Sequence, residues 1–264
     1  MTIPIVLSIA GSDSGGGAGI QADIKSISAN GGYAATVLSA LTAQNSHGVA
    51  GIEPISAEFV DQQLTAVLSD LTVKAIKVGM LGDPEVIRVV AKHIKAANVE
   101  HVVVDPVMVS ANGDVLLPSS SVQTLKEALF PLASVLTPNT HEAALLINTD
   151  SQTLLAQPDK FIDQFSGWPP IVLKGVGGRE VNHHDDWLIE QGACTVVAGR
   201  KVNSHNTHGT GCSHSAAIAT YLALGFDLLG ACQQAKRYVS QALQASDQLT
   251  IGSGKGPIHH FFKQ

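Results

Sequence analysis

Short apolar runs alternate with stretches of helical spacing along the chain, and this alternation restricts the fold more than any other feature of the sequence. The runs that favour strands are residues 5–9, 35–41, 75–78, 101–104, 134–136 and 171–173. The stretches that favour helices are residues 18–29, 56–71, a segment that starts at Asp83-Pro84-Glu85, 210–224 and 227–247. Strands separated by helices of this length form right-handed β-α-β units. We therefore expect an α/β fold with a mostly parallel central sheet.

The composition limits the classes of function that the chain can serve. No repeat, low-complexity stretch or change in composition marks a linker, so we expect a single domain over residues 1–264. A net charge of −6 without any basic run argues against nucleic-acid binding, which needs many Lys and Arg side chains. The apolar run at residues 3–10 is too short to span a membrane. The three cysteines include no CxxC pair, which favours a reducing cytoplasm over a disulfide scaffold.

Glycines and polar residues follow the expected strands directly. In parallel sheets with helices on their faces, ligands bind beyond the carboxyl ends of the strands. The positions of this kind are residues 11–19, Gly79, Asp105, Asn139, Lys174 and residues 209–212. We expect these residues to lie along one edge of the sheet and to form a ligand site there.

The segment GSDSGGGAG, residues 11–19, joins the first expected strand to the first expected helix. Glycine allows a ligand to approach the backbone closely. The segment is not a Walker A loop, because no Gly-Lys-Ser/Thr follows it, and its GxGxG spacing does not match the dinucleotide-binding GxGxxG. Asp23 and Lys25 also come too early for the ribose-binding acid of a dehydrogenase. The segment is either a ligand-binding loop of another kind or a flexible connection.

The segment NTHGTGCS, residues 206–213, opens a late helix. The residues that would leave backbone N–H groups without partners at its positive end are Thr207, Gly209, Thr210 and Gly211. Such an end binds anions and would stabilise a phosphoryl group in transfer. Cys212 lies in the first turn, so we expect the helix dipole to lower the pKa of its thiol. The alternative is a capped helix with a small buried cysteine.

Single charged and amide side chains follow three later strands. Asp105 ends one apolar run, and Asn139 and Glu142 follow another. Carboxylates and an amide in these positions would hold Mg²⁺ through water and approach nucleotide phosphates. Lys174 would neutralise phosphate as a point charge. The alternative is that Asp105 caps a helix and Glu142 stabilises a first turn.

Six motifs and a closing segment occur in a fixed order over nearly the whole chain. They are residues 9–25, 42–48, 77–81, 104–108, 136–139 with Glu142, 206–212, and the closing segment 256–261. In sequence and order they resemble the hydroxymethylpyrimidine/phosphomethylpyrimidine kinases of thiamine biosynthesis, which have the ribokinase-like fold. The resemblance implies a three-layer αβα sandwich, ATP and Mg²⁺ as cofactors, and a homodimer. It also implies two successive phosphorylations, first of 4-amino-5-hydroxymethyl-2-methylpyrimidine and then of its monophosphate.

The matching motifs imply a role for each candidate residue. Gln44 would bind the edge of the aminopyrimidine, because a side-chain amide offers both a donor and an acceptor. The residues that would line the same pocket are Gly11, Ala18, Asp23, Met80 and Val107. On the nucleotide side the candidates are Asn139, Lys174 and Thr207, with Asp105 and Glu142 at the metal. The catalytic candidates are Gly209, Thr210, Gly211 and Cys212, where Cys212 replaces the aspartate base of many ribokinase-like sugar kinases.

The chain departs from the family pattern in two places, and two other functions stay open. Where the family commonly has a lysine after Met108, residues 110–114 are SANGD, and Val176 interrupts the Lys-Gly-Gly that usually ends a later strand. Pyridoxal kinase is one alternative, because pyridoxal also presents a hydroxymethyl group on a six-membered aromatic ring. Gln44 and Cys212 favour the pyrimidine. A protein that binds a pyrimidine without catalysis is the second alternative.

Overall fold

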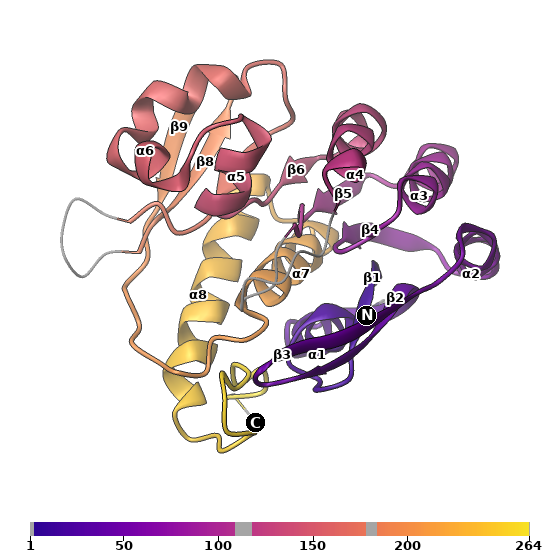
Figure 1. Cartoon of the computed structure of the whole chain (residues 1–264), viewed down its shortest axis with the longest axis horizontal. Coiled ribbons are helices and arrows are strands. Elements are labelled where there is room, and N and C mark those ends of the chain that lie inside the picture. Colours follow the sequence, from indigo (N-terminus) through magenta and orange to yellow (C-terminus); the bar gives the residue numbers. More distant parts are fainter. Residues whose placement is uncertain (1–2, 109–117, 178–183, 264) are drawn as a thin grey trace.

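The computed structural model describes residues 3–108, 118–177 and 184–263. Their strands form one sheet in the order β3-β2-β1-β4-β5-β6-β7-β8-β9 (Figure 1). The strands are β1 (Ile5–Asp13), β2 (Tyr33–Asn45), β3 (Gly48–Pro54), β4 (Val73–Val78), β5 (His101–Val104), β6 (Val135–Leu136), β7 (Ile171–Leu173), β8 (Asp186–Glu190) and β9 (Ala193–Val197). Neighbouring strands from β2 to β7 run parallel, and the outer strands β3, β8 and β9 run antiparallel to their neighbours. The expected mostly parallel sheet is confirmed.

Helices cover both faces of the sheet. They are α1 (Gly19–Ala29), α2 (Ala57–Asp70), α3 (Pro84–Ala97), α4 (Ser119–Thr124), α5 (Thr140–Leu146), α6 (Ser151–Ala156), α7 (Thr210–Ala223) and α8 (Leu228–Ser246). A π-helical turn (Leu125–Leu129) and a 3-10 turn (Phe130–Leu132) continue α4, and a 3-10 segment (Pro158–Phe165) follows α6. One apolar core lies between the sheet and α2, α3, α5 and α6, and the other between the sheet and α1, α7 and α8. The result is the three-layer αβα sandwich that the resemblance implied.

The central strands are apolar on both faces because both faces are covered. In β1, Leu7 and Ile9 enter one core and Val6 enters the other, and all three are fully buried. The same division places Ile76 of β4 in the first core and Val103 of β5 in the second. Parallel strands covered on both faces are continuous apolar runs rather than alternating ones. This explains why the sequence shows these strands so clearly.

Several helix starts agree with the capping signals in the sequence. The Ser56 side chain accepts a hydrogen bond from Phe59 N–H at the start of α2. Asp83 accepts from Glu85 N–H at the start of α3, with proline at the first helical position. These side chains satisfy backbone donors that the first turn leaves free. The expected positions of both starts are confirmed.

The sheet has more edge strands than the sequence predicted. The strand β3 is largely exposed, so it has no apolar run to reveal it. The strands β8 and β9 form a hairpin whose two-residue connection, Gln191-Gly192, has positive φ at both positions. That geometry belongs to the tight turns of two-residue hairpins. Glutamine is an unusual residue there, which is why the turn was missed.

The order of the strands places a crevice at the carboxyl ends of β1 and β4. From β1 the chain crosses through α1 to β2 on one side, and it returns through α2 to β4 on the other side. Ligands in such sheets bind where the strand order reverses in this way. The segment without the family's lysine, residues 110–114, lies outside the described residues, as does Gly178. Within the described ranges, no helix is long and apolar enough to cross a membrane.

Candidate functional site

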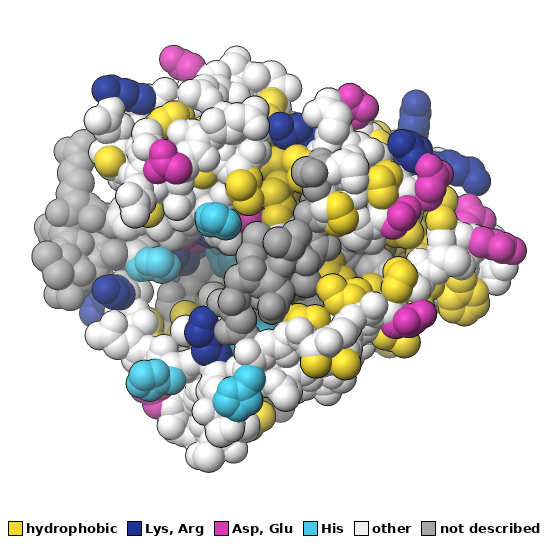
Figure 2. Space-filling model, viewed as in Figure 1, with side chains coloured by type: hydrophobic (Ala, Val, Ile, Leu, Met, Phe, Trp, Pro, Cys, Tyr) yellow, Lys and Arg dark blue, Asp and Glu magenta, His cyan; other side chains and the backbone are white. Residues whose placement is uncertain are grey.

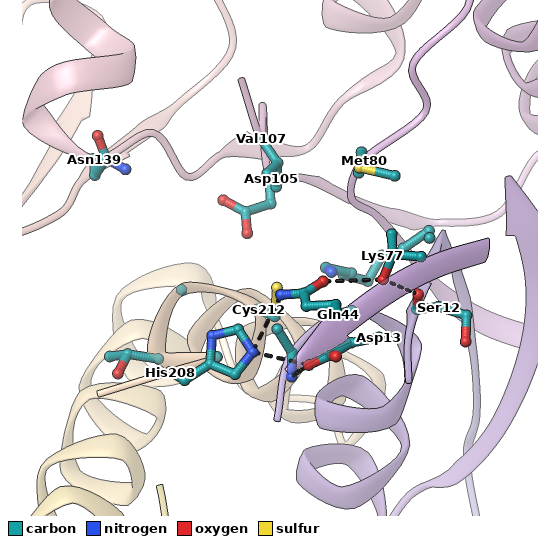
Figure 3. Close-up of a pocket in the computed structure, with 18 of the residues that line it drawn as sticks. Ser12, Asp13, Gln44, Lys77, Met80, Asp105, Val107, Asn139, His208 and Cys212 are labelled. Carbon is teal, nitrogen blue, oxygen red and sulfur yellow. Dashed lines mark hydrogen bonds and ion pairs between the residues drawn. The ribbon is translucent and has the colours of Figure 1, made fainter. Parts of the chain in front are cut away.

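A cavity of about 310 Å³ lies at the carboxyl ends of the central strands, next to the start of α7 (Figure 3). In the space-filling view, histidine and basic side chains border a hollow on one face of the molecule (Figure 2). Every candidate site residue but one lines the cavity: Gly11, Ala18, Gln44, Met80, Asp105, Val107, Asn139, Glu142, Lys174, Thr207, Gly209, Thr210, Gly211 and Cys212. Gln44 and Cys212 therefore share one cavity, although 167 intervening residues separate them in sequence. Their roles toward a substrate remain predictions.

Asp23 does not line the cavity, contrary to expectation. Its position on α1 turns the carboxylate toward the sheet, where it is completely buried. It accepts hydrogen bonds from Lys77 Nζ at 2.8 and 3.0 Å and from Ser8 Oγ at 2.6 Å. Lys77 itself reaches the cavity wall and was missed in the sequence, where it stands inside an otherwise apolar strand. Burial opposes the positive charge of Lys77, but the charge and hydrogen bond of Asp23, together with smaller contributions such as the charge of Asp105, raise the pKa of the ammonium group.

The Cys212 thiol is not activated as the sequence predicted. Burial raises its pKa to about 11, and the nearby Lys77 charge only partly offsets this effect. The expectation of a lowered pKa considered the helix dipole alone, whereas the loss of water around the sulfur is the larger influence. In the free protein near neutral pH, Cys212 is therefore a neutral thiol.

The loop before α7 presents free backbone donors to the cavity. Gly209 is the N-cap of α7 and has φ of 78°. Thr210 N–H bonds to Thr207 O at 3.3 Å, and no described residue accepts from the N–H of Gly211 or Cys212. Such a helix start is an anion site. Of the four N–H groups expected to be free, those of Gly209 and Gly211 have no described acceptor, whereas that of Thr210 is bonded and that of Thr207 bonds to His205 O at 3.2 Å.

The two glycine-rich loops touch each other. A side chain at Gly209 would place its Cβ 1.8 Å from Gly17 O, and one at Gly17 would come 2.4 Å from the His208 ring. Asp13 Oδ2 lies 2.8 Å from His208 Nε2, and the same carboxylate accepts from three backbone N–H groups of the first loop. Neither Asp13 nor His208 was a candidate from the sequence. Both stand inside the quoted motifs, but no local rule assigns them a partner.

Lys174 pairs with a buried carboxylate beside the start of α7, where a Cβ at Gly211 would lie 3.4 Å from Lys174 Nζ. Asp105 Oδ1 accepts from Lys174 Nζ at 2.8 Å and from Thr137 Oγ1 at 3.0 Å. Glu142 forms a capping box with Asn139 at the start of α5. Burial raises the pKa of Glu142 to about 7, although Lys174 draws it down. Burial works against the charge of Asp105 too, but the charges of Lys174 and Lys77 and the hydrogen bonds to the carboxylate together lower its pKa.

These two carboxylates fit the usual way in which proteins hold Mg²⁺. Asp105 and Glu142 both face the cavity, and the ion is commonly bound by one or two carboxylates together with phosphate oxygens and water. A site in which protein side chains alone surround the metal would be a different arrangement. In residues 3–108, 118–177 and 184–263, no group of three or more His, Cys, Asp or Glu side chains could hold a metal.

A second cavity of about 500 Å³ adjoins the first at the start of α7. The residues that line both are Asn139, Lys174, Thr207, Thr210 and Gly211. Beyond them, the second cavity has apolar walls from Val202, Val239 and Leu243 and basic side chains from Arg200 and Lys201. Small-molecule sites commonly combine apolar walls with a few polar groups in this way. The sequence did not reveal this cavity, because its walls come from distant segments without a shared motif.

Comparison with known proteins gives consistent matches over the length of the chain. The model of the family described as phosphomethylpyrimidine kinase matches residues 13–259. A hydroxymethylpyrimidine/phosphomethylpyrimidine kinase of Rhizobium meliloti is 44% identical over 263 residues, which are 98% of this chain and 97% of that protein.

Two solved structures share the fold. Pyridoxal kinase of Bacillus subtilis, in an ADP complex, superposes with a TM-score of 0.86 at 33% identity and covers 98% of both chains. Phosphomethylpyrimidine kinase of Clostridium difficile superposes with a TM-score of 0.74 at 34% identity, over 90% of this chain and 99% of that one.

Replacing Lys77 by Met should lower the free energy of unfolding by about 3–5 kcal/mol, because Asp23 is then buried without its partner. The double variant Lys77→Met/Asp23→Asn should recover most of that loss, since neither charge remains in the interior. Urea denaturation measures both effects. Lys92→Met is the control, because it removes an exposed ion pair with Asp61 and should change little. A double variant no more stable than the single one would contradict this account.

Replacing Gly209 by Ala should destabilise the protein more than replacing Gly225 by Ala. Both glycines have positive φ, 78° and 91°, so each substitution carries a conformational cost of roughly 1–2 kcal/mol. Only at Gly209 would the new methyl group meet backbone atoms of the other loop; at Gly225 no described atom lies within 4 Å. Urea denaturation of the two variants isolates the cost of separating the loops. Equal losses would show that the contact between the loops is not tight.

Proposed function

The chain belongs to the phosphomethylpyrimidine kinase family, a family of phosphotransferases of thiamine biosynthesis, and we propose how its cavities perform that reaction. The substrates are ATP and 4-amino-5-hydroxymethyl-2-methylpyrimidine, and then the monophosphate of that pyrimidine. The observation that supports this proposal most directly is the shared cavity. Gln44 lies on one wall, the free N–H groups at the start of α7 lie on another, and one small ring fits between them.

The wall around Gln44 suits the aminopyrimidine ring. Met80 and Val107 supply apolar surface for the ring faces, and the Gln44 amide supplies hydrogen bonds for the ring edge (Figure 3). A ring held in this way directs its hydroxymethyl group toward Cys212 and the start of α7. Fixing the alcohol beside the phosphate converts an encounter in solution into a reaction between bound neighbours.

The opposite wall stabilises the phosphoryl group during transfer. The N–H groups of Gly211 and Cys212 and the ammonium group of Lys174 face the place where negative charge develops. Each donor of this kind is worth about 2.7–4 kcal/mol in other enzymes. Phosphoryl transfer needs little help from a base. With its pKa near 11, Cys212 acts mainly as a neutral partner that positions the hydroxyl, not as a strong base.

The second cavity binds the nucleotide in this proposal. Its apolar walls accept the base, and Lys174 and Thr210, shared with the first cavity, meet the phosphates. The fold of the Bacillus subtilis protein that binds ADP is consistent with this. Asp105 and Glu142 would hold Mg²⁺, which would neutralise phosphate charge when bound.

Two further features of the proposal concern the whole protein. We propose that it acts as a homodimer, as the resemblance implies, and in the cytoplasm, which the cysteine pattern favours. Light scattering should then give about twice the chain mass of 27.5 kDa. A single-chain mass at working concentration would remove the dimer from the proposal without affecting the reaction.

An assay of ADP release should show which alcohol the enzyme phosphorylates. We expect turnover of the aminopyrimidine and of its monophosphate, with a lower kcat/KM for pyridoxal, because the Gln44 amide matches an amino group beside a ring nitrogen. A higher kcat/KM for pyridoxal would make the chain a pyridoxal kinase instead. Binding of the aminopyrimidine without ADP release from any substrate would indicate a protein that binds without catalysis.

Replacing Cys212 by Ala should lower kcat roughly tenfold to a hundredfold and leave activity that can be measured. A residue that acts as an essential general base contributes about 10²–10⁴, and the neutral thiol should contribute less. Cys194→Ala is the matched control, because that cysteine is exposed on β9, outside both cavities. An unchanged kcat would remove Cys212 from the mechanism, and a complete loss would restore it as the base.

A further inference from the structure

The Gln44 amide is held by two neighbours that restrict which way it faces. Its backbone is fixed first, because Ser14 Oγ donates to Gln44 O at 2.7 Å and accepts from Gln44 N–H at 2.8 Å. The side chain then extends toward His208 (Figure 3), and its amide also contacts Thr42. Gln44 Nε2 lies 3.3 Å from His208 Nε2, and Gln44 Oε1 lies 3.0 Å from Thr42 Oγ1. The protons available at these two contacts decide the orientation of the amide.

On the His208 side, the ring nitrogen must carry a proton. Nε2 lies 2.8 Å from Asp13 Oδ2, and an ionised carboxylate only accepts hydrogen bonds. The Asp13 carboxylate is ionised: burial opposes its charge, but hydrogen bonds from His208 and from the loop lower its pKa. The His208 N–H is therefore donated to Asp13, and Nε2 has no lone pair with which to accept a hydrogen bond from Gln44. An amide NH₂ group facing that N–H sets donor against donor, whereas an amide oxygen in the same place avoids this conflict.

On the Thr42 side, the hydroxyl proton is already committed. Thr42 Oγ1 lies 2.9 Å from Ser12 O, a backbone carbonyl that can only accept. A hydroxyl has one proton, so Thr42 has none left for Gln44 Oε1. Its free lone pairs would instead accept from an amide NH₂ group. Both contacts are satisfied when the amide turns by 180° about its last side-chain bond.

We infer that His208 and Thr42 are positioning residues that fix the Gln44 amide with its oxygen toward His208 and its nitrogen toward Thr42. One amide N–H then bonds to Thr42 Oγ1, and the other is left for the ligand. One lone pair of the oxygen is likewise left for the ligand. The cavity thus offers an acceptor on the His208 side and a donor on the Thr42 side.

The fixed amide selects rings with one order of polar groups. An amino group donates to the oxygen, and the neighbouring ring nitrogen accepts from the N–H, so the amino group lies on the His208 side. The 4-oxo analogue of the pyrimidine has the reverse order, with a carbonyl oxygen beside a ring N–H. It would need the opposite amide orientation, which His208 and Thr42 oppose. This inference rests on the proposed function, since it concerns the substrate bound by Gln44.

The test compares kcat/KM for the aminopyrimidine and for its 4-oxo analogue. The native enzyme should prefer the amino compound strongly, because a site built for one hydrogen-bond pattern rejects the reverse. Thr42→Val removes the acceptor and should reduce this preference by about tenfold, the ratio that one hydrogen bond is worth. Most of the change should appear in KM for the pyrimidine, with KM for ATP unmoved. Thr42→Ser, which keeps the hydroxyl, should restore the preference.

His208→Ala should reduce the same preference, and His205→Ala is its matched control. His205 is an exposed histidine three positions earlier that lines neither cavity. Thermal unfolding of each variant checks its folding, and the Thr42 pair decides the matter if His208→Ala does not fold. A preference unchanged in Thr42→Val would overturn the inference, as would a native enzyme that accepts both rings equally. No turnover of either ring by the native enzyme would instead overturn the proposed function, and this inference with it.

Discussion

The contact between the two glycine-rich loops is the constraint on which the rest of the site depends. One carboxylate, that of Asp13, accepts from three N–H groups of the first loop and bonds to His208 at the start of the second. The carbonyl of Gly17 occupies the space that any side chain at Gly209 would need. The walls that we propose for the ring and for the phosphate are therefore fixed against each other. Their separation sets the distance between alcohol and phosphate, on which the rate depends steeply.

Buried charge is the second feature that distinguishes this cavity from an ordinary core. Lys77 pairs with Asp23 beneath it, and Lys174 pairs with Asp105 at its wall. In many proteins, the free energy needed to remove both charges of such a pair from water exceeds the free energy gained from their attraction. Stability alone does not explain why they are kept. In the proposed mechanism, the pairing holds the Lys174 cation beside the phosphate site, where an arriving triphosphate would compete with Asp105 for it.

Much of the fold followed from the sequence, because burial on both faces and helix capping leave local signals. The apolar strands and the starts of α2 and α3 were found in this way. The hairpin of β8 and β9 was missed, since its partly exposed strands and its Gln191-Gly192 turn carry weak signals. At the site, the order of the motifs correctly predicted that Gln44 and Cys212 line one cavity. The predictions that Asp23 lines the cavity and that the pKa of Cys212 is lowered were wrong, because burial depends on contacts that only the folded chain creates.

The resemblance to pyridoxal kinase clarifies what the fold determines. A protein named for a different ring shares this architecture at a TM-score of 0.86. The sheet, the two loops and the anion-binding start of α7 therefore fit phosphate transfer to a hydroxymethyl group without specifying which ring bears it. The choice of ring must come from the few side chains at its edge. There the position of Gln44 is not sufficient, because an amide can face either way. In our inference, the protons of His208 and Thr42 supply the missing information, because their bonds to Asp13 and Ser12 fix what each can offer the amide.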